Sequence, residues 1–321
     1  MMIRFARVAS CAAALIASAQ VCLAGYVMVP NISSGHQAIS LFDSNNGALI
    51  NANFIVGDAS NVFSSPREAI QVGHQVWISD QVANKVFRYD LDSQSFLPAI
   101  TGDGTTSLSN LRGLEVVGNT VFVANAGSGF GNSVVMINAT TGSVTGSFPV
   151  GSNLGPWDVQ AYNGNLLVSN YSSSSSGMSR VDVYDTGGNF VNSLVTTTNN
   201  AGGLFGPQQV TVEANGNVLV GGFSGGANSG VYEFDSAGVQ QGRVASALGP
   251  RGGYRLGNGN IMFTKGDGVW AWDTNTNAAV GLYTGTGLVN STYISPITYI
   301  PAPGVAAFGV VLCLGARRRS R

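Results

Sequence analysis

The residues of this sequence that could bind a ligand or take part in catalysis form six pairs, which occupy equivalent positions in six copies of a sequence repeat. The pairs are Arg67-Glu68, Arg112-Gly113, Trp157-Asp158, Gln208-Gln209, Arg251-Gly252 and Ile297-Thr298, and five of them follow a proline. Three arginines so placed favour the binding of an anion, although they can instead pair with Glu68 and Asp158. We predict a ligand site formed by Arg67, Arg112, Trp157, Asp158, Gln208 and Arg251.

The rest of the sequence supplies no assembled catalytic set. Its two histidines, His36 and His74, both lie in Gly-His-Gln turns. A Gly-x-Ser-x-Gly elbow, a His-Glu-x-x-His pair and a phosphate-binding loop are all missing. The three cysteines lie in the terminal segments, which excludes thiolate chemistry and thiolate metal sites from the body of the protein. We therefore favour a binding protein over an enzyme and expect no cofactor.

Four short alternating stretches, separated by turns, position each pair. In the clearest copy these stretches are 65–72, 75–80, 85–90 and 95–101, which predicts a four-stranded antiparallel meander. An Asp or Asn ends the third stretch of every copy, at Asp43, Asp90, Asn138, Asp185, Asp235 and Asp273. Such side chains accept hydrogen bonds from backbone N–H groups of the following turn, so we interpret them as turn formers.

The length of the repeat indicates the fold. Four strands in a period of 40 to 50 residues are typical of a β-propeller, whose first strands line a central channel. The first copy supplies only three strands, and the last strand, 296–300, has nothing following it. We predict an all-β, six-bladed propeller over residues 25–300, closed by pairing of its N- and C-terminal strands. The six pairs would then gather at one mouth of the channel.

Both ends of the chain differ in character from this fold. Residues 1–24 have a basic start, an apolar middle and the ending Cys22-Leu23-Ala24, as in a secretory signal peptide. At the other end, Pro301-Ala302-Pro303 precedes an apolar run over 305–316 and a cluster that includes Arg317, Arg318 and Arg319. The apolar run is shorter than the roughly 20 residues of a stable transmembrane helix.

This tail, 301–321, resembles the PEP-CTERM sorting signals of Gram-negative bacteria, with Ala302 where the family usually has Glu. The resemblance implies recognition by an exosortase-type membrane protease, removal of the tail and delivery to the cell surface or extracellular matrix. Proteins with such tails are typically linked to exopolysaccharide production. The alternative is a plain C-terminal membrane anchor, a transmembrane helix that the tail would keep.

The body, 26–300, resembles the six-bladed NHL and gluconolactonase-like propellers, through Val76-Trp77-Ile78-Ser79-Asp80 and Val121-Phe122-Val123-Ala124-Asn125. Likeness to the gluconolactonases implies one divalent cation at the channel mouth, held by Glu, Asn and Asp oxygens. Here Glu68, Asn125, Asp158 and Asn170 would supply those oxygens, which suit calcium. A calcium-dependent hydrolase is therefore the alternative function.

The charge of the body excludes one class of partner. Six of the 15 basic residues lie in the terminal segments, which leaves nine basic against 16 acidic residues and a net charge of −7. A protein that binds nucleic acid needs basic patches, so we exclude that class. We predict an exported, surface-sorted propeller that acts as a binding or structural module of the bacterial envelope or matrix. Its expected partners are exopolysaccharide or another surface protein.

Overall fold

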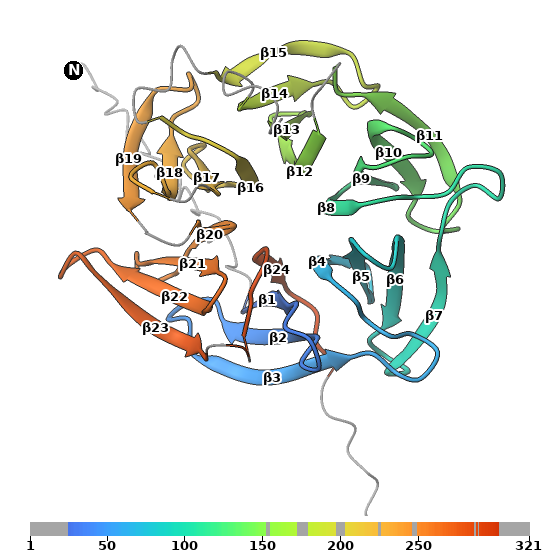
Figure 1. Ribbon diagram of the computed structural model, residues 1–321, viewed down its shortest axis with the longest axis horizontal. Coiled ribbons are helices and arrows are strands. Elements are labelled where there is room, and N and C mark those ends of the chain that lie inside the picture. Colours follow the sequence, from blue (N-terminus) through green and yellow to red (C-terminus); the bar gives the residue numbers. More distant parts are fainter. Residues whose placement is uncertain are drawn as a thin grey trace, which may run out of the picture.

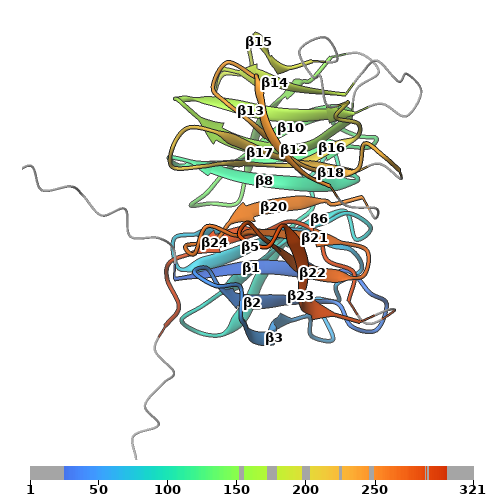
Figure 2. The same cartoon turned by 90° about the vertical axis from the view of Figure 1, so that its left-hand side faces the viewer.

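Six four-stranded antiparallel sheets form a closed ring, which confirms the predicted all-β, six-bladed propeller (Figure 1). The computed structural model describes residues 25–151, 155–171, 179–196, 203–223, 226–245, 249–285, 287 and 289–301. The predicted signal peptide lies outside these ranges, as do Ala302, Pro303 and the three arginines of the predicted sorting tail. The innermost strands run from one face of the ring toward the other, as the side view shows (Figure 2).

Each blade is a meander whose first strand lies nearest the channel. Blade 2 contains β4 (Pro66–Val72), β5 (Gln75–Asp80), β6 (Lys85–Asp90) and β7 (Ser95–Ile100). Blade 3 contains β8 (Leu111–Val117), β9 (Thr120–Ala126), β10 (Asn132–Asn138) and β11 (Val144–Pro149). Blade 4 contains β12 (Gly155–Tyr162), β13 (Asn165–Tyr171), β14 (Arg180–Tyr184) and β15 (Phe190–Val195). Blade 5 contains β16 (Pro207–Val212), β17 (Val218–Gly222), β18 (Gly230–Phe234) and β19 (Gln240–Ala245), and blade 6 contains β20 (Gly252–Arg255), β21 (Ile261–Lys265), β22 (Gly268–Asp273) and β23 (Ala278–Thr284).

Blade 1 closes the ring with strands from both ends of the chain. It contains β1 (Tyr26–Asn31), β2 (Ala38–Asp43), β3 (Leu49–Val56) and, innermost, β24 (Ser295–Ile297). Strands β24 and β1 are antiparallel, with Met28 opposite Ser295 and Tyr26 opposite Ile297. The predicted closure is confirmed. The strand is shorter than predicted, because residues after Ile297 leave β1 and bind instead to blade 2, where Gln71 Oε1 accepts the N–H groups of Thr298 and Tyr299.

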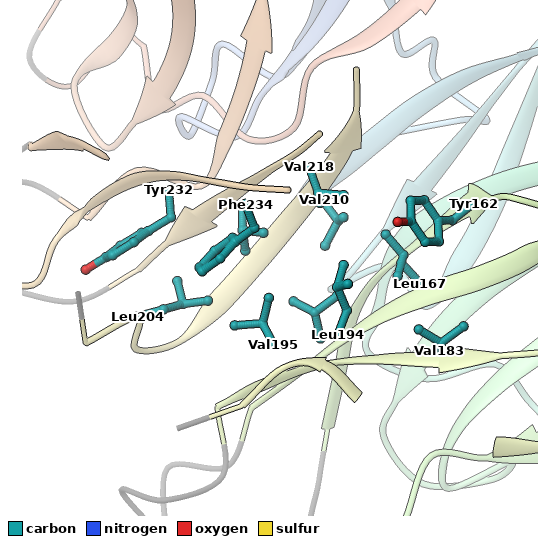
Figure 3. Close-up of a cluster of buried hydrophobic side chains, with 12 residues drawn as sticks. Tyr162, Leu167, Val183, Leu194, Val195, Leu204, Val210, Val218, Tyr232 and Phe234 are labelled. Atoms are coloured by element: carbon teal, nitrogen blue, oxygen red, sulfur yellow. The ribbon is translucent and has the colours of Figure 1, made fainter. Parts of the chain in front are cut away.

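Apolar side chains between neighbouring blades form the core. Between blades 4 and 5, for example, Leu167, Val183 and Leu194 pack with Val210, Tyr232 and Phe234 (Figure 3). Alternate residues of a strand lie on the same face of its sheet, and these side chains lie on the faces that the two blades turn toward each other. Because every sheet buries both faces against its neighbours, the core is distributed around the ring and holds the innermost strands in fixed positions.

Hydroxyl groups add a second link between blades, close to the channel. Ser79, Ser169 and Thr264 occupy equivalent positions near the ends of β5, β13 and β21. Their hydroxyls donate to the backbone carbonyls of Arg112, Gln208 and Thr292 in the next blade around the ring. These hydrogen bonds hold the carbonyls of three channel-lining residues at fixed positions.

We expect Ser169→Ala to lower the free energy of unfolding by about 1 kcal/mol, because it leaves the buried carbonyl of Gln208 without its donor. Urea unfolding at neutral pH measures the change. Ser93→Ala is the matched control, since that serine lies in an exposed turn. Equal unfolding midpoints for Ser169→Ala and the unaltered protein would contradict a stabilising role for these links.

The six Asp and Asn turn formers behave as predicted. Asp43 Oδ1 accepts the N–H groups of Asn45 and Asn46, and Asn138 Oδ1 accepts those of Thr140 and Thr141. The corresponding oxygens of Asp185, Asp235 and Asp273 bind the N–H groups of their own turns in the same way. These side chains are therefore committed to local structure.

Candidate functional site

Equivalent residues of the six innermost strands form three rings around the channel. We define the upper ring as Arg67, Arg112, Trp157, Gln208, Arg251 and Thr292, the middle ring as Glu68, Gly113, Asp158, Gln209, Gly252 and Tyr293, and the lower ring as Ile70, Glu115, Gln160, Thr211, Tyr254 and Ser295. A shift of register follows the proline position in β4, β12 and β16. Such a shift marks a β-bulge, in which one extra residue changes the direction of the neighbouring side chains, here those of the upper and middle rings.

The pairing corrects one predicted pair. Ser291 forms a β-bridge with Asn31, at the position where Pro66 pairs with Asp80 in blade 2. Thr292-Tyr293 therefore occupies the place that the sequence suggested for Ile297-Thr298. Ile297 is instead fully buried in the core between blades 1 and 2. Thr298 lies at the opposite end of the channel from the arginines, where it lines a cavity with Gln71. Proline was a misleading marker here, because Ser291 replaces it in this one blade.

Tyr293 closes the channel. Its side chain is fully buried, and its hydroxyl donates to the carbonyl of Trp157 at 3.0 Å, which joins blade 1 to blade 4 on the opposite side of the ring. Its backbone N–H donates to the carbonyl of Arg67 at 3.2 Å. The segment that leads into β24 thus fills the middle ring and separates the two ends of the channel.

The middle ring also holds three polar side chains that bind across blades. Glu68 accepts hydrogen bonds from Leu114 N at 2.5 Å and Ser295 Oγ at 2.7 Å, and Asp158 Oδ2 accepts one from Val210 N at 2.7 Å. The Gln209 amide binds both backbone groups of Ile294. Glycine occupies the other two inward positions of this ring, because a Cβ on Gly113 would collide with Asp158, and one on Gly252 with Gln209.

Burial dominates the electrostatics of the middle ring. Glu68 is 4 % exposed, and loss of hydration raises its pKa to about 8. Burial, and then repulsion from Glu68, raise the pKa of Asp158 well above its usual range. The pKa of Tyr293 is raised in the same way, by burial first and then by Asp158. Burial therefore favours the protonated forms of Glu68 and Asp158.

The structure brings the three predicted arginines together at the upper ring, which we call the arginine mouth. Arg67 Nε donates to Gln81 Oε1 at 2.6 Å, and Arg112 Nη1 donates to the carbonyl of Pro156 at 3.0 Å. Arg251 Nη1 donates to the carbonyl of Ser291 at 2.8 Å and to the Asn290 side chain. Burial lowers the pKa of Arg112 and of Arg251 to about 10.

The other predicted ligand-site residues have more restricted roles. The guanidinium of Arg112 lies 3.6 Å from the centre of the Trp157 ring, so one face of this indole is already covered. Gln208 is 2 % exposed, and its Oε1 atom has no hydrogen-bond partner among the described residues. Asp158 lies one layer below the arginines, at 1 % exposure, so it belongs to the closed middle ring.

The alternative calcium ligands have hydrogen-bond partners of their own, although Asp158 Oδ1 and Asn170 Oδ1 are buried without a partner among the described residues. Asn125 binds Ser109 N and the carbonyl of Gly131 within its own blade, and Asn170 Nδ2 binds Asp182. Glu68 and Asp158 already accept backbone N–H groups. In the described part of the chain, no three His, Cys, Asp or Glu side chains are grouped to hold a metal. The calcium site stays a prediction.

A cavity of about 800 Å³ opens at the other end of the channel, and we call it the strand-end cavity. The whole lower ring lines it. Glu68 and Ile294 line its inner end, next to the middle ring, and Val116, Val212, Leu256 and Pro296 line its wall. Cavities of this size with apolar walls and a few convergent polar groups are the usual places for small ligands.

Carboxylates outnumber cations in the strand-end cavity. Glu213 pairs with Arg255 through a 2.5 Å contact, whereas Glu68 and Glu115 form no ion pair in the described part of the protein. Glu115 is held in place by Gln160 Nε2 and by the N–H groups of Val116 and Ala161. Burial raises its pKa. Thr211 Oγ1 is buried and has no hydrogen-bond partner among the described residues, so a ligand could supply one.

Sequence reasoning missed this cavity although a signal was present. Glu115, Gln160 and Thr211 lie two positions after Gly113, Asp158 and Gln209 in the same strands. Side chains two apart in a strand share a face, so these residues had to face the channel as well. The closure of the channel by the middle ring was not predicted, because the sequence pattern favoured Pro296 as the proline position of the last strand. That alignment placed Ile297 and Thr298, instead of Thr292 and Tyr293, at the channel.

Similarity to known proteins lies in the fold. No family model and no curated protein matches the chain. Similar solved structures include a protein of unknown function from Bacteroides caccae, with 13 % identity and a TM-score of 0.58 over 86 % of this chain and 100 % of that one. A nidogen/laminin complex has 12 % identity and a TM-score of 0.61 over 84 % and 97 % of the two chains. Hydrazine synthase from Kuenenia stuttgartiensis has 17 % identity and a TM-score of 0.52 over 72 % and 68 %.

These similarities support the propeller architecture. They do not indicate a function, because one fold can host many functions. They do not show the NHL or gluconolactonase-like family. Among the described residues, no helix is long and apolar enough to cross a membrane. The apolar run over 305–316 lies outside those residues.

Proposed function

We propose that this protein is an exported propeller of the bacterial envelope or matrix that binds a small amine-bearing ligand in the strand-end cavity. The carrying observation is the blind cavity that Tyr293 creates by closing the channel. A rigid ring with a closed floor can hold a ligand without a moving lid. The signal-peptide pattern and the sorting tail support export and surface delivery through an exosortase-type protease.

The chemistry of the cavity favours a cation over an anion. Glu68 at the floor and Glu115 in the lower ring are carboxyl groups without a cationic partner, and the one arginine in the lining is paired with Glu213. An ammonium group placed between them would favour ionisation of these carboxyl groups, because a nearby cation lowers a raised carboxyl pKa, and it would supply three hydrogen-bond donors. Thr211 and Gln160 offer bonds to hydroxyl groups, and Tyr254 and Leu256 offer apolar contact. An amino sugar unit of an exopolysaccharide has this combination of groups.

We expect glucosamine to raise the melting temperature of the protein and glucose to raise it far less, since the two sugars differ only in the amine. Glu115→Gln keeps the size of the side chain but removes its charge, so it should weaken glucosamine binding about tenfold or more, as loss of a charged hydrogen bond does. Thermal shift and calorimetry on the same samples measure both effects.

The control is Asp58→Asn, which neutralises an exposed turn carboxylate far from the channel. It should leave glucosamine binding unchanged. Amine binding should also release a proton, because a nearby cation lowers the raised pKa of Glu68 and Glu115. Equal responses to glucosamine and glucose, or full binding by Glu115→Gln, would reject the proposed ligand class.

A further inference from the structure

The arginine mouth presents three guanidinium groups from three different blades. Arg67, Arg112 and Arg251 belong to blades 2, 3 and 6, at equivalent positions of the upper ring. Each is only partly exposed. Repulsion from Arg67 contributes to the lowered pKa values of Arg112 and Arg251, after the effect of burial. Arg67 is therefore close enough to both of the other arginines to repel them.

No carboxylate of the described residues forms an ion pair with these arginines. Asp80 attracts Arg67 electrostatically, but it is fully buried and its oxygens accept the backbone N–H groups of Ser64, Ser65, Val82 and Ala83. All 16 acidic residues lie between Asp43 and Asp273, at positions that the structure describes. The ion pairs among described residues use Arg180, Arg255, Lys265 and His74, and none uses an arginine of the mouth. The carboxyl groups of Glu68 and Asp158, in the adjacent middle ring, are buried, and burial raises the pKa of both. Half-buried cations that repel one another and form no ion pair are costly to hold together, and a bound anion would reduce that cost.

The mouth also has hydrogen-bonding capacity to spare. A guanidinium has five N–H donors, and the described hydrogen bonds of Arg67 use only its Nε, while those of Arg251 use only its Nη1. The Arg251 guanidinium also lies 5.5 Å from the centre of the Phe223 ring. Arg112 is held rigidly by its stacking on Trp157 and its bond to Pro156. The unpartnered Oε1 of Gln208, in the same ring, is an acceptor that suits a hydroxyl group.

We propose that the arginine mouth is a second binding site, which takes the carboxylate or phosphate group of a hydroxylated ligand. Terminal guanidinium nitrogens bind planar carboxylate and phosphate oxygens in pairs, and anchoring by three blades fixes their geometry. The site lies on the face of the ring opposite the strand-end cavity, with Tyr293 between them. Its ligand has the opposite charge to the one proposed for the cavity, and the two proposals stand independently.

The experiment measures binding of glucuronate, glucose and inorganic phosphate to the exported protein by calorimetry, at low and at high salt. We expect glucuronate, phosphate or both to bind while glucose does not, and binding to weaken as salt rises because the charges are partly exposed. Binding of glucuronate alone identifies a carboxylate ligand, and binding of phosphate alone identifies a phosphorylated one.

Substitutions localise the binding. Arg251→Gln and Arg112→Gln should each weaken anion binding about tenfold or more, and Arg251→Lys should have an intermediate effect, because a point charge replaces a fork of donors. Arg243→Gln is the control, since this arginine is exposed on the outermost strand of blade 5. Circular dichroism checks that ligand-free Arg251→Gln keeps its fold, because the substitution also removes the hydrogen bonds of Arg251 to Asn290 and Ser291.

Absence of binding by both anions at low salt would overturn the proposal. So would anion binding that Arg251→Gln leaves unchanged. Glucosamine binding in the strand-end cavity should be unaffected by the arginine substitutions, so a failure of one site is distinguishable from a failure of the other.

Discussion

A chain that covers residues 25–300 is expected to unfold in one cooperative transition, whereas a chain that ends at Asn290 should not reach a stable fold. The shorter chain lacks β24 and the closing segment, including Tyr293, Ile294 and Ile297, which are 0 to 1 % exposed. Loss of one large buried side chain costs about 2–5 kcal/mol, and a whole domain is stable by only about 5–15 kcal/mol. The missing strand also exposes an edge of β1 that would invite aggregation.

Circular dichroism and thermal unfolding of the two chains measure this difference. Two point variants refine it within the full ring. Tyr293→Ala should cost several kcal/mol, because it empties the closed middle ring, while Tyr293→Phe should cost about 1 kcal/mol for the hydrogen bond to Trp157. If the two chain lengths unfold at the same temperature, then the closing segment does not hold the ring together.

The free energy of unfolding is expected to fall as the pH rises from about 5 to about 8. In the unfolded chain Glu68 loses its proton near its ordinary pKa of 4.5, whereas burial raises its pKa in the folded protein to about 8. Between these values the folded state binds more protons than the unfolded state, so stability falls with rising pH. The contribution is complete below the lower pKa and is lost as the pH passes the upper one. Burial raises the pKa of Asp158, Glu115 and Glu213 as well, so these groups add in the same direction.

Urea unfolding at pH 5 and pH 8 measures this loss, which should amount to a few kcal/mol because one pKa unit corresponds to about 1.4 kcal/mol. Glu68→Gln resembles the protonated side chain, and the Ser295 hydroxyl can reverse its bond to suit it. This variant should show a clearly smaller loss between the two pH values. Asp58→Asn is the control, since hydrogen bonds from the backbone N–H of Ser60 help to lower the pKa of Asp58 below this range. A pH dependence that Glu68→Gln leaves intact would refute the role of the middle ring.

Much of the architecture was predictable because local chemistry repeats along the chain. The turn formers Asp43, Asn138 and Asp235 and the alternating strands before them determine four-stranded units, and their number determines a six-bladed ring. The gathering of Arg67, Arg112 and Arg251 followed from the same repeat, since equivalent positions of equivalent strands meet at one end of the channel.

The state of the channel depended on contacts between residues far apart in the sequence. Tyr293 reaches Trp157, 136 residues away, and Ser295 reaches Glu68, 227 residues away. No local pattern encodes these contacts, and Pro296 suggested a different alignment of the closing segment. Sequence alone thus determined the six blades and the arginine mouth. Only the tertiary structure decided that the channel is closed in its middle and opens into a cavity rich in carboxyl groups, because closure results from side chains of four blades meeting on one axis.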